Sequence, residues 1–329
     1  MTLCVAWVRN ATEPDELFFA TDSRLRGLGV WDSGIKLFEL KRAGCLIAFH
    51  GGTELAYTLL NHLNYNLLGR DEFQNAHCDV HDLADPLADL FSSLVAGISD
   101  YPADIERDKV STGFLFGGWS WRQGDFALWR VSYNSAQRRY VPEPLVASDR
   151  GHVAAFIGSA DDRVAEAADE LRALATSPEL DLEPVTVLSR RVLPNDGNST
   201  VGGPVQLARV HRSGVVEFLG VMWNGRPNLR CQDLSAGELT DVQLLDLETG
   251  EELTGLPRRF ANWRDYDFGA DAIFIQRCFE GDGGSLASDL QPEERRKLAR
   301  ILRQIAYAEF LKRLKADEAS AAAELESNE

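Results

Sequence analysis

The chain has 329 residues, of which 44% are hydrophobic and 26% charged, the composition of a globular protein that can bury a sizeable core. Its net charge of −17 at pH 7 argues against nucleic acid and anionic membranes as partners. The five cysteines are scattered, a nucleophile at position 2 leaves no room for a signal peptide, and there is no apolar run of ~18 residues. We therefore expect a cytoplasmic protein without a membrane span.

Three apolar segments near the N-terminus have the composition of β-strands. Residues 2–8 are rich in strand formers, and residues 17–20 follow a polar stretch at 9–15 that is typical of a hairpin loop. The third segment, residues 45–49, runs into a glycine pair at 51–52. We therefore expect two strands joined by a hairpin loop, and a third strand that leads into the first helix.

Helix and strand patterns then follow one another up to about residue 219. Apolar residues at helical spacing predict helices over 55–63, 83–98, 161–175 and 184–193. Short apolar runs predict strands over 112–118, 126–131, 153–157, 204–210 and 215–219. The elements thus follow the order strands, two helices, strands, two helices, strands. This order favours an α+β chain with two sheets flanked by helices.

The C-terminal part of the chain follows a different pattern. A hairpin is expected at 242–251, a flexible glycine-rich joint at 280–285 and an amphipathic helix from Pro292 onward. We therefore expect one domain over residues 1–220 and a C-terminal extension over 221–329 that ends in this helix.

The residue after Met1 has the chemistry of a nucleophile. Removal of Met1 would leave Thr2 with a hydroxyl nucleophile and, in its own α-amine, a general base. Such an amine has a pKa of about 7.7–8.0, and a buried lysine beside it favours the neutral amine and the developing alkoxide. Lys36, held by Asp22, is of the right type for that role, and the N–H of Gly51 at a strand-to-helix turn is suited to bind an oxyanion.

These residues belong to a longer pattern that extends over residues 2 to 220. It resembles the proteasome-type N-terminal-nucleophile (Ntn) hydrolases, and most closely their bacterial HslV and Anbu branches. The resemblance depends on the order and spacing of its parts rather than on any single motif. The matching segments are Thr2, Ala20-Thr21-Asp22-Ser23-Arg24, Gly34-Ile35-Lys36, Phe49-His50-Gly51-Gly52, Ala155-Phe156-Ile157-Gly158-Ser159 and Asn198-Ser199-Thr200-Val201-Gly202-Gly203-Pro204.

The resemblance implies a four-layer αββα sandwich, here with a C-terminal extension, and a threonine-type peptidase or amidohydrolase that needs no cofactor and no metal. It also implies a peptide or protein substrate, assembly into a homo-oligomer and, by analogy alone, an ATPase unfoldase as partner. Catalytic roles fall to Thr2, Asp22, Lys36, Gly51 and Ser159, and substrate contacts to Ser23, Arg24 and Phe49.

Two other functions stay open at this point. One is an inactive proteasome-like scaffold or interaction protein that keeps Met1, and the other is a small-molecule amidohydrolase that works without a ring. His50 stands where the family has a small residue, and the family's downstream aspartate has no clear counterpart among Asp196, Asn198, Ser199 and Thr200. Single residues also have simpler interpretations, because Lys36 could be a surface lysine, Asp22 a turn residue and Ser159 a helix N-cap.

A metal or nucleotide site has little support in the sequence. His77, Cys78 and Asp79 are of ligand type and share one loop, but no partner pair stands elsewhere in the chain. The glycine-rich stretch at 281–284 lacks the lysine and hydroxyl residue of a phosphate-binding loop. We therefore expect neither a metal nor a nucleotide.

Overall fold

The structure is a computed structural model in which the chain forms two compact units. The first comprises Met1–Leu234 with Leu245–Gly250, and the second Ser235–Leu244 with Glu251–Glu329. Among the described residues, no helix is long and apolar enough to cross a membrane. The structure describes residues 2–11, 15–26, 29–42, 44–74, 78–99, 105–192, 199–224, 226–234, 242–245, 247, 252–254, 268–280, 285–287, 290–291, 294, 297–298 and 301.

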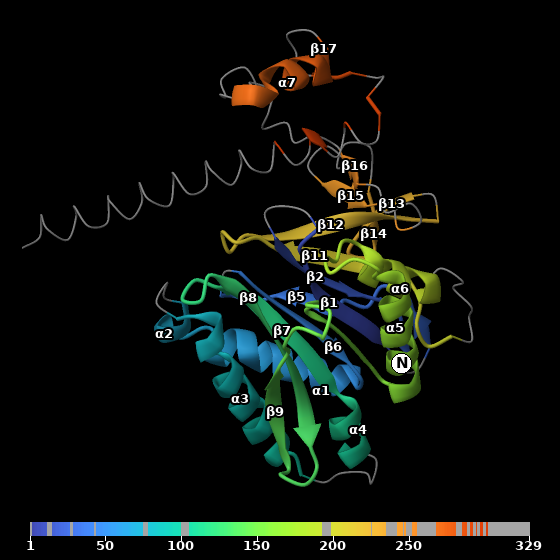
Figure 1. The fold of residues 1–329 in the computed structure, drawn as a ribbon. Coiled ribbons are helices and arrows are strands. Elements are labelled where there is room, and N and C mark those ends of the chain that lie inside the picture. Colours follow the sequence, from blue (N-terminus) through green and yellow to red (C-terminus); the bar gives the residue numbers. More distant parts are fainter. Residues whose placement is uncertain are drawn as a thin grey trace, which may run out of the picture. The chain divides into compact units, whose positions relative to one another are not determined.

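The first unit is built on a sheet in which β1 is the second strand from one edge (Figure 1). Its strands lie in the order β10-β1-β2-β11-β12-β13-β14, and β1 pairs antiparallel with both of its neighbours. This pairing sets Leu3 opposite Gly158 and Cys4 opposite Thr21. The strands are β1 (Leu3–Arg9), β2 (Glu16–Thr21), β10 (Ala154–Gly158), β11 (Gln206–Val210), β12 (Val216–Trp223), β13 (Arg226–Leu229) and β14 (Gln232–Asp233).

A second antiparallel sheet of the same unit has the strand order β5-β6-β7-β8-β9. In this sheet β6 sets Ala48 opposite Leu37 and His50 opposite Gly113. A short separate hairpin joins β3 (Leu25–Arg26) to β4 (Val30–Trp31). The strands of the second sheet are β5 (Leu37–Glu39), β6 (Cys45–His50), β7 (Gly113–Ser120), β8 (Asp125–Asn134) and β9 (Arg139–Pro144).

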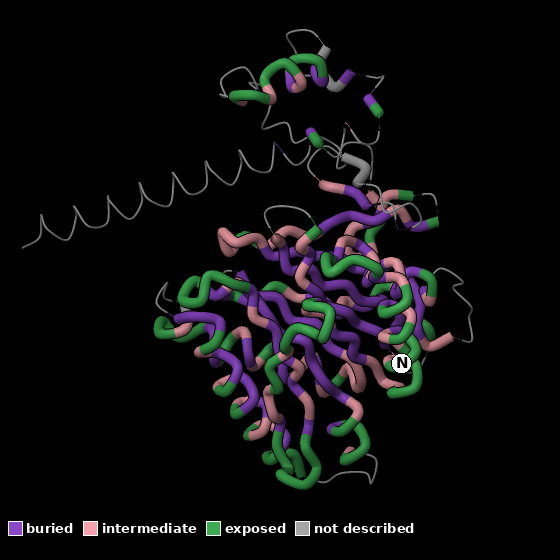
Figure 2. The backbone as a smooth tube through the Cα atoms, viewed as in Figure 1, coloured by how far each residue is buried: buried purple, intermediate pink, exposed green. Residues whose placement is uncertain are grey.

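The two sheets share an apolar cluster that joins their facing sides. Cys4 and Ala6 of β1 meet Leu46 and Ala48 of β6 and Leu115 of β7 in this cluster. Figure 2 shows the strands of both sheets largely in the buried colour and the connecting loops exposed. Burial of this apolar area, at about 25 cal/mol per Å², is the main free energy that holds the sheets together.

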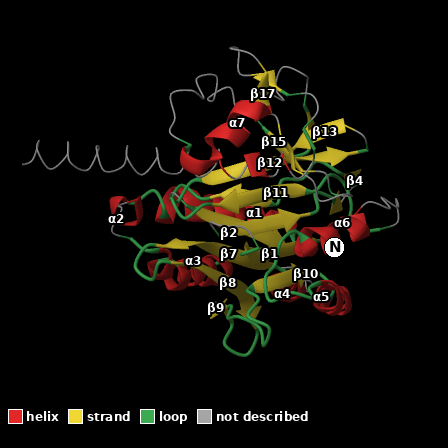
Figure 3. Cartoon of the chain, turned by 45° about the horizontal axis from the view of Figure 1, so that its top comes forward, coloured by secondary structure: helices red, strands yellow, loops and turns green. Residues whose placement is uncertain are grey.

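Helices cover the outer faces of both sheets (Figure 3). Side chains of α1 and α3 pack on the second sheet in one cluster, and those of α5 and α6 pack on the first sheet in another. The helical segments are α1 (Thr53–His62), the π-turn η1 (Leu63–Leu67), α2 (Asp71–Gln74), the 3₁₀ turn η2 (Val80–Asp82), α3 (Ala84–Ala96), α4 (Ile105–Ser111), α5 (Asp161–Leu174) and α6 (Glu183–Val192). The predicted α+β class is therefore confirmed, and so are the four helices and the strands expected up to residue 219.

A buried ionic cluster ties β2, β11 and β12 together at one end of the first sheet. The fully buried guanidinium of Arg209 contacts the carboxylates of Glu16, at 3.2 Å, and Glu217. The ring of His211 bridges the same two carboxylates, at 3.3 and 3.2 Å. Although burial opposes ionisation, Arg209 and His211 lower the pKa of the Glu217 carboxyl from 4.5 to about 2.

We expect Glu217→Gln to lower the free energy of unfolding at pH 7 by about 1.5–3 kcal/mol, the range for hydrogen bonds to charged groups. The folded-state pKa of Glu217 is depressed, so its contribution is complete above pH 4.5 and is lost as the pH falls toward about 2. Urea unfolding of both proteins over this pH range should therefore show a difference that shrinks with acidification. Glu143→Gln is the control, because Glu143 is exposed and lies 4.0 Å from Arg130.

The second unit has a small apolar cluster of its own. Ile275 and Cys278 of α7 (Ala272–Cys278) pack with Phe279, Leu298 and Ile301. The predicted hairpin at 242–251 corresponds to β15 (Gln243–Leu245) and β16 (Glu252–Thr254), which pair with each other. The remaining elements are η5 (Gly269–Asp271), β17 (Phe279–Glu280) and β18 (Ser285–Leu286).

The predicted C-terminal helix is described only at its beginning. Glu294, Lys297, Leu298 and Ile301 are helical, and Lys297 lies 2.9 Å from Asp271. Residues 302–329, which would continue the helix, lie outside the described residues, as does the joint at 281–284. The two apolar positions that are described, Leu298 and Ile301, are buried, as the predicted apolar stripe requires.

Candidate active site

Thr2 stands at the N-terminal end of β1 and is almost fully buried, with 6% of its surface exposed. Its carbonyl oxygen accepts a hydrogen bond of 3.2 Å from the N–H of Ser159, the residue after β10. The following N–H, that of Leu3, donates to Asp22 at 3.1 Å. The backbone on either side of Thr2 is thus fixed by a neighbouring strand and by a carboxylate.

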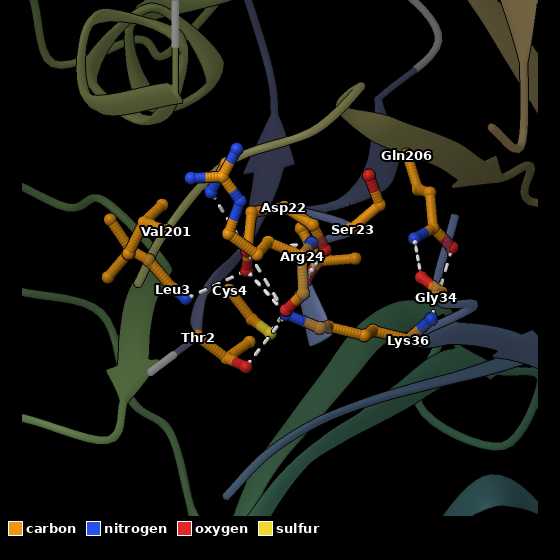
Figure 4. Close-up of polar contacts among 12 residues, drawn as sticks. Thr2, Leu3, Cys4, Asp22, Ser23, Arg24, Gly34, Lys36, Val201 and Gln206 are labelled. Carbon is orange, nitrogen blue, oxygen red and sulfur yellow. Dashed lines mark hydrogen bonds and ion pairs between the residues drawn. The ribbon is translucent and has the colours of Figure 1, made fainter. Parts of the chain in front are cut away.

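Lys36 is the cation of this site (Figure 4), and its side chain is fully buried. Its Nζ donates to the Thr2 hydroxyl oxygen at 2.8 Å and to the two Asp22 carboxylate oxygens at 3.0 and 3.1 Å. A further contact of 2.6 Å reaches the carbonyl oxygen of Arg24. The full burial rules out a solvated surface lysine, and an ammonium group in contact with a hydroxyl favours that hydroxyl's anionic form.

Asp22 follows β2 and is likewise fully buried. Burial raises the pKa of its carboxyl, and the Lys36 ammonium and backbone N–H donors act against this rise. Those donors are the N–H groups of Leu3, Arg24 and Gly202, at 3.1 to 3.3 Å. Each of these contacts is with a donor, which is what an ionised carboxylate requires.

Ser23 and Arg24, the expected substrate contacts, hold the loop around the site. The Ser23 hydroxyl donates to the carbonyl oxygen of Pro204 at 2.7 Å, and the Arg24 guanidinium binds both carboxylate oxygens of Asp32. Arg24 also donates to the carbonyl oxygen of Ser199 at 3.0 Å. Both side chains are buried, so their contact with a substrate stays a prediction.

Gln206 is a site residue that the sequence did not single out. Its side-chain oxygen accepts from the Lys36 N–H at 3.1 Å, and its amide nitrogen donates to the Gly34 carbonyl at 2.7 Å. This pair of bonds fixes the backbone that carries the lysine (Figure 4). The available signal was an amide side chain within a mostly apolar predicted strand, where a buried amide needs partners.

Gly51, the predicted oxyanion donor, has a backbone conformation that favours glycine. Its φ is +99°, and a Cβ built there would overlap the Ser111 carbonyl oxygen, so glycine is the residue that fits. Within the described part of the chain, the Gly51 N–H donates no hydrogen bond. The neighbouring Gly52 N–H, in contrast, donates to the Thr112 hydroxyl at 2.9 Å.

Ser159 and Phe49 flank the site in different ways. Ser159 binds Thr2 through its backbone, and the N-cap of α5 is Ala160, without a side-chain cap bond, so the N-cap interpretation of Ser159 is wrong. Phe49 is fully buried and packs against Phe38 and Tyr57, with ring centroids 6.3 and 5.5 Å away. A role for Phe49 in substrate contact stays a prediction.

The nearest thiol to Thr2 along β1 does not compete with it as a nucleophile. The Cys4 Sγ lies 3.1 Å from the Thr21 hydroxyl and 3.2 Å from the Phe49 carbonyl. Burial raises the pKa of the Cys4 thiol to about 12, so it stays protonated at neutral pH. This agrees with its expected role as a reduced core thiol.

The described residues contain no group of three side chains placed to hold a metal ion. Asp79 caps the turn η2 by accepting a hydrogen bond from the His81 N–H. Cys78 is buried, and its carbonyl oxygen accepts a hydrogen bond from the Arg42 guanidinium. His77 lies outside the described residues, as do Asp196 and Asn198, which were considered for the family's downstream aspartate.

Comparison with known proteins gives a likeness among solved structures alone. No family model matches the chain, and no curated protein matches it. Among solved structures, the chain is similar to Anbu (ancestral beta-subunit) from Yersinia bercovieri, with a TM-score of 0.42 and 17% identity, over 63% of this chain and 81% of that one. At these values the chemistry of Thr2, Asp22 and Lys36 has to be judged from their own geometry.

Proposed function

We propose that the protein is a threonine-type Ntn hydrolase that cleaves amide bonds through Thr2 after Met1 has been removed. The observation that carries this proposal is the buried contact of 2.8 Å between Lys36 Nζ and the Thr2 hydroxyl, with Asp22 3.0 Å from the same nitrogen. A buried ion pair that touches the hydroxyl of the second residue supplies what a threonine nucleophile needs.

In the proposed first step, the Thr2 hydroxyl oxygen attacks the carbonyl carbon of the substrate amide. The free α-amine of Thr2 accepts the hydroxyl proton, and the positive charge of Lys36 stabilises the developing alkoxide. The carbonyl oxygen becomes an oxyanion that the Gly51 N–H binds. The carbon–nitrogen bond then breaks, the α-amine passes its proton to the leaving nitrogen, and an ester joins Thr2 to the acyl group.

In the second step, water hydrolyses this ester. The α-amine accepts a proton from the attacking water, and the hydroxide adds to the ester carbonyl. The Thr2 oxygen leaves and takes this proton back, so the enzyme returns to its starting state and the acyl group departs as a carboxylic acid. Ser159 assists by holding the Thr2 backbone, and the cycle requires neither a metal nor a redox cofactor.

The same proposal covers the finer description of the fold and the assembly. We infer that the two facing sheets with helices on their outer faces are the four-layer αββα sandwich of Ntn hydrolases, and that residues 221–329 form an extension to it. The substrates are peptides or proteins, with Ser23, Arg24 and Phe49 around the acyl side. A cytoplasmic homo-oligomer, with an ATPase unfoldase as partner by analogy, completes the proposal.

The test is the chemical state of Thr2. We expect the intact mass of the purified protein to be one methionine short, and a β-lactone or epoxyketone probe to add one equivalent to the N-terminal peptide. A full-length mass and no labelling would contradict the proposal, and would favour the alternative of an inactive proteasome-like scaffold that keeps Met1. Analytical ultracentrifugation of the same sample tests the homo-oligomer, which a monodisperse monomer would contradict.

A further inference from the structure

A pocket of about 500 Å³ opens beside the start of β1. Gly158 pairs with Leu3 and Ser159 donates to the Thr2 carbonyl, so the wall of the pocket formed by β10 adjoins the nucleophile. Its volume falls within the range of small-ligand sites. The lining residues are His50, Glu106, Arg107, Val110, Ser111, Gly158, Ser159 and Asp161.

His50 reaches this pocket because of its position on β6. Alternate residues of a strand face opposite sides of a sheet. On β6, Cys45, Ile47 and Phe49 pack in the cluster with α1 and α3, whereas Leu46 and Ala48 pack in the cluster with the first sheet. His50 therefore continues the row that faces the first sheet, at the end of β6 where the Phe49 carbonyl contacts Cys4.

The His50 ring offers a hydrogen-bonding group that the protein itself does not use. Its Nδ1 is buried and has no partner among the described residues. The other side of the ring is close to Gly113, where a built Cβ would lie only 2.7 Å from Nε2. Burial, helped by the charges of Arg130 and Lys36, lowers the pKa of His50 to about 4, so the imidazole is neutral at pH 7 and can donate one hydrogen bond and accept another.

The position of the pocket suits the part of the substrate that leaves when the scissile bond breaks. In the mechanism above, the α-amine of Thr2 hands its proton to the leaving nitrogen, so that nitrogen must lie on the side of Thr2 where the amine is. The amine is at the start of β1, and the pocket walls formed by Ser159 and His50 adjoin that end of the strand. A peptide segment that extends from the leaving nitrogen would therefore enter this pocket.

We propose that His50 is a specificity-determining residue whose imidazole hydrogen-bonds the peptide on the leaving side of the scissile bond. The preferred substrates are then peptides that continue beyond that bond, rather than amides that release ammonia or a small amine. This inference rests on the proposed function, because only the direction of proton transfer relates the pocket to the leaving side.

The experiment compares two substrates with the same acyl part. One ends in a p-nitroanilide, and the other continues for two residues beyond the scissile bond. His50→Ala should lower kcat/KM for the longer peptide about tenfold, the effect of one lost hydrogen bond, and that for the anilide by less than about threefold. His62→Ala, a substitution on α1 at a histidine that does not line the pocket, is the matched control and should leave both values unchanged.

Two further variants keep the test decisive if His50→Ala does not fold. His50→Asn places an amide near the position of the imidazole and should recover part of the rate on the longer peptide, whereas Val110→Trp fills the pocket and should reproduce the selective loss. Equal losses on both substrates would overturn the inference. A wild-type protein that takes no label on Thr2 and cleaves neither substrate would instead overturn the proposed function, a result that the labelling experiment distinguishes.

Discussion

Thr2→Ala should reduce amide hydrolysis at least ~10³-fold and leave the protein folded. Alanine is also small enough for Met1 to be removed, so this variant keeps the α-amine and loses the hydroxyl together with the γ-methyl group. The hydrogen bond from Lys36 Nζ to that hydroxyl is lost, which costs about 1 kcal/mol, or about 2–4 °C in melting temperature. Initial rates on peptide substrates and thermal unfolding by circular dichroism measure the two effects.

Thr2→Ser is the control for this prediction. Serine keeps the hydroxyl and a free α-amine, so the variant should retain measurable turnover and should still react with a β-lactone. Unchanged hydrolysis by Thr2→Ala would show that another residue is the nucleophile, and the proposed mechanism would have to be abandoned.

Lys36→Met should destabilise the protein by about 3–5 kcal/mol, which corresponds to about 6–20 °C in melting temperature. The substitution leaves the fully buried carboxylate of Asp22 without its cation. Burial already raises the pKa of Asp22, so the unpaired carboxyl is tolerated best when it is protonated. The destabilisation should therefore be larger at pH 8 than at pH 5, as urea unfolding at the two pH values would measure.

Lys109→Met is the matched control for the lysine substitution. Lys109 is also buried, but its partner Glu106 is 58% exposed and keeps its hydration when the lysine is lost, so the cost should stay near 1 kcal/mol. A second comparison is the double variant Lys36→Met with Asp22→Asn. It removes both charges and should recover part of the stability that Lys36→Met alone loses. If Lys36→Met were as stable as the wild type at pH 8, Asp22 would not depend on Lys36 for its charge.

The sequence predicted the parts of the fold that have strong periodic patterns. The four helices with apolar stripes and the strands from residue 2 to residue 219 were within reach, because burial of one face imposes a period on the residues. It did not predict β9, whose Pro142 and Pro144 argue against a strand. The structure places β9 at the edge of its sheet, where a missing N–H is tolerated.

The site could be predicted only as residue types in an order. Thr2, Asp22 and Lys36 come from three separate segments, and the sequence alone could not exclude a turn aspartate or a surface lysine. Burial excludes the surface lysine, because the side chains of Asp22 and Lys36 are both 0% exposed. The contribution of α4 to the pocket could not be predicted, because the sequence of this helix (IERDKVS) is short and mostly polar. Its position in the pocket depends on tertiary packing.

The buried end of β1 has a practical consequence for how this protein is handled. Thr2 is 6% exposed and its carbonyl is bound by the N–H of Ser159, so little space is left around this residue. An affinity tag or a leftover cloning residue ahead of Thr2 would acylate the amine on which the proposed turnover depends. Recombinant protein for assays should therefore carry its tag elsewhere, and an inactive N-terminally tagged sample would not contradict the proposed function.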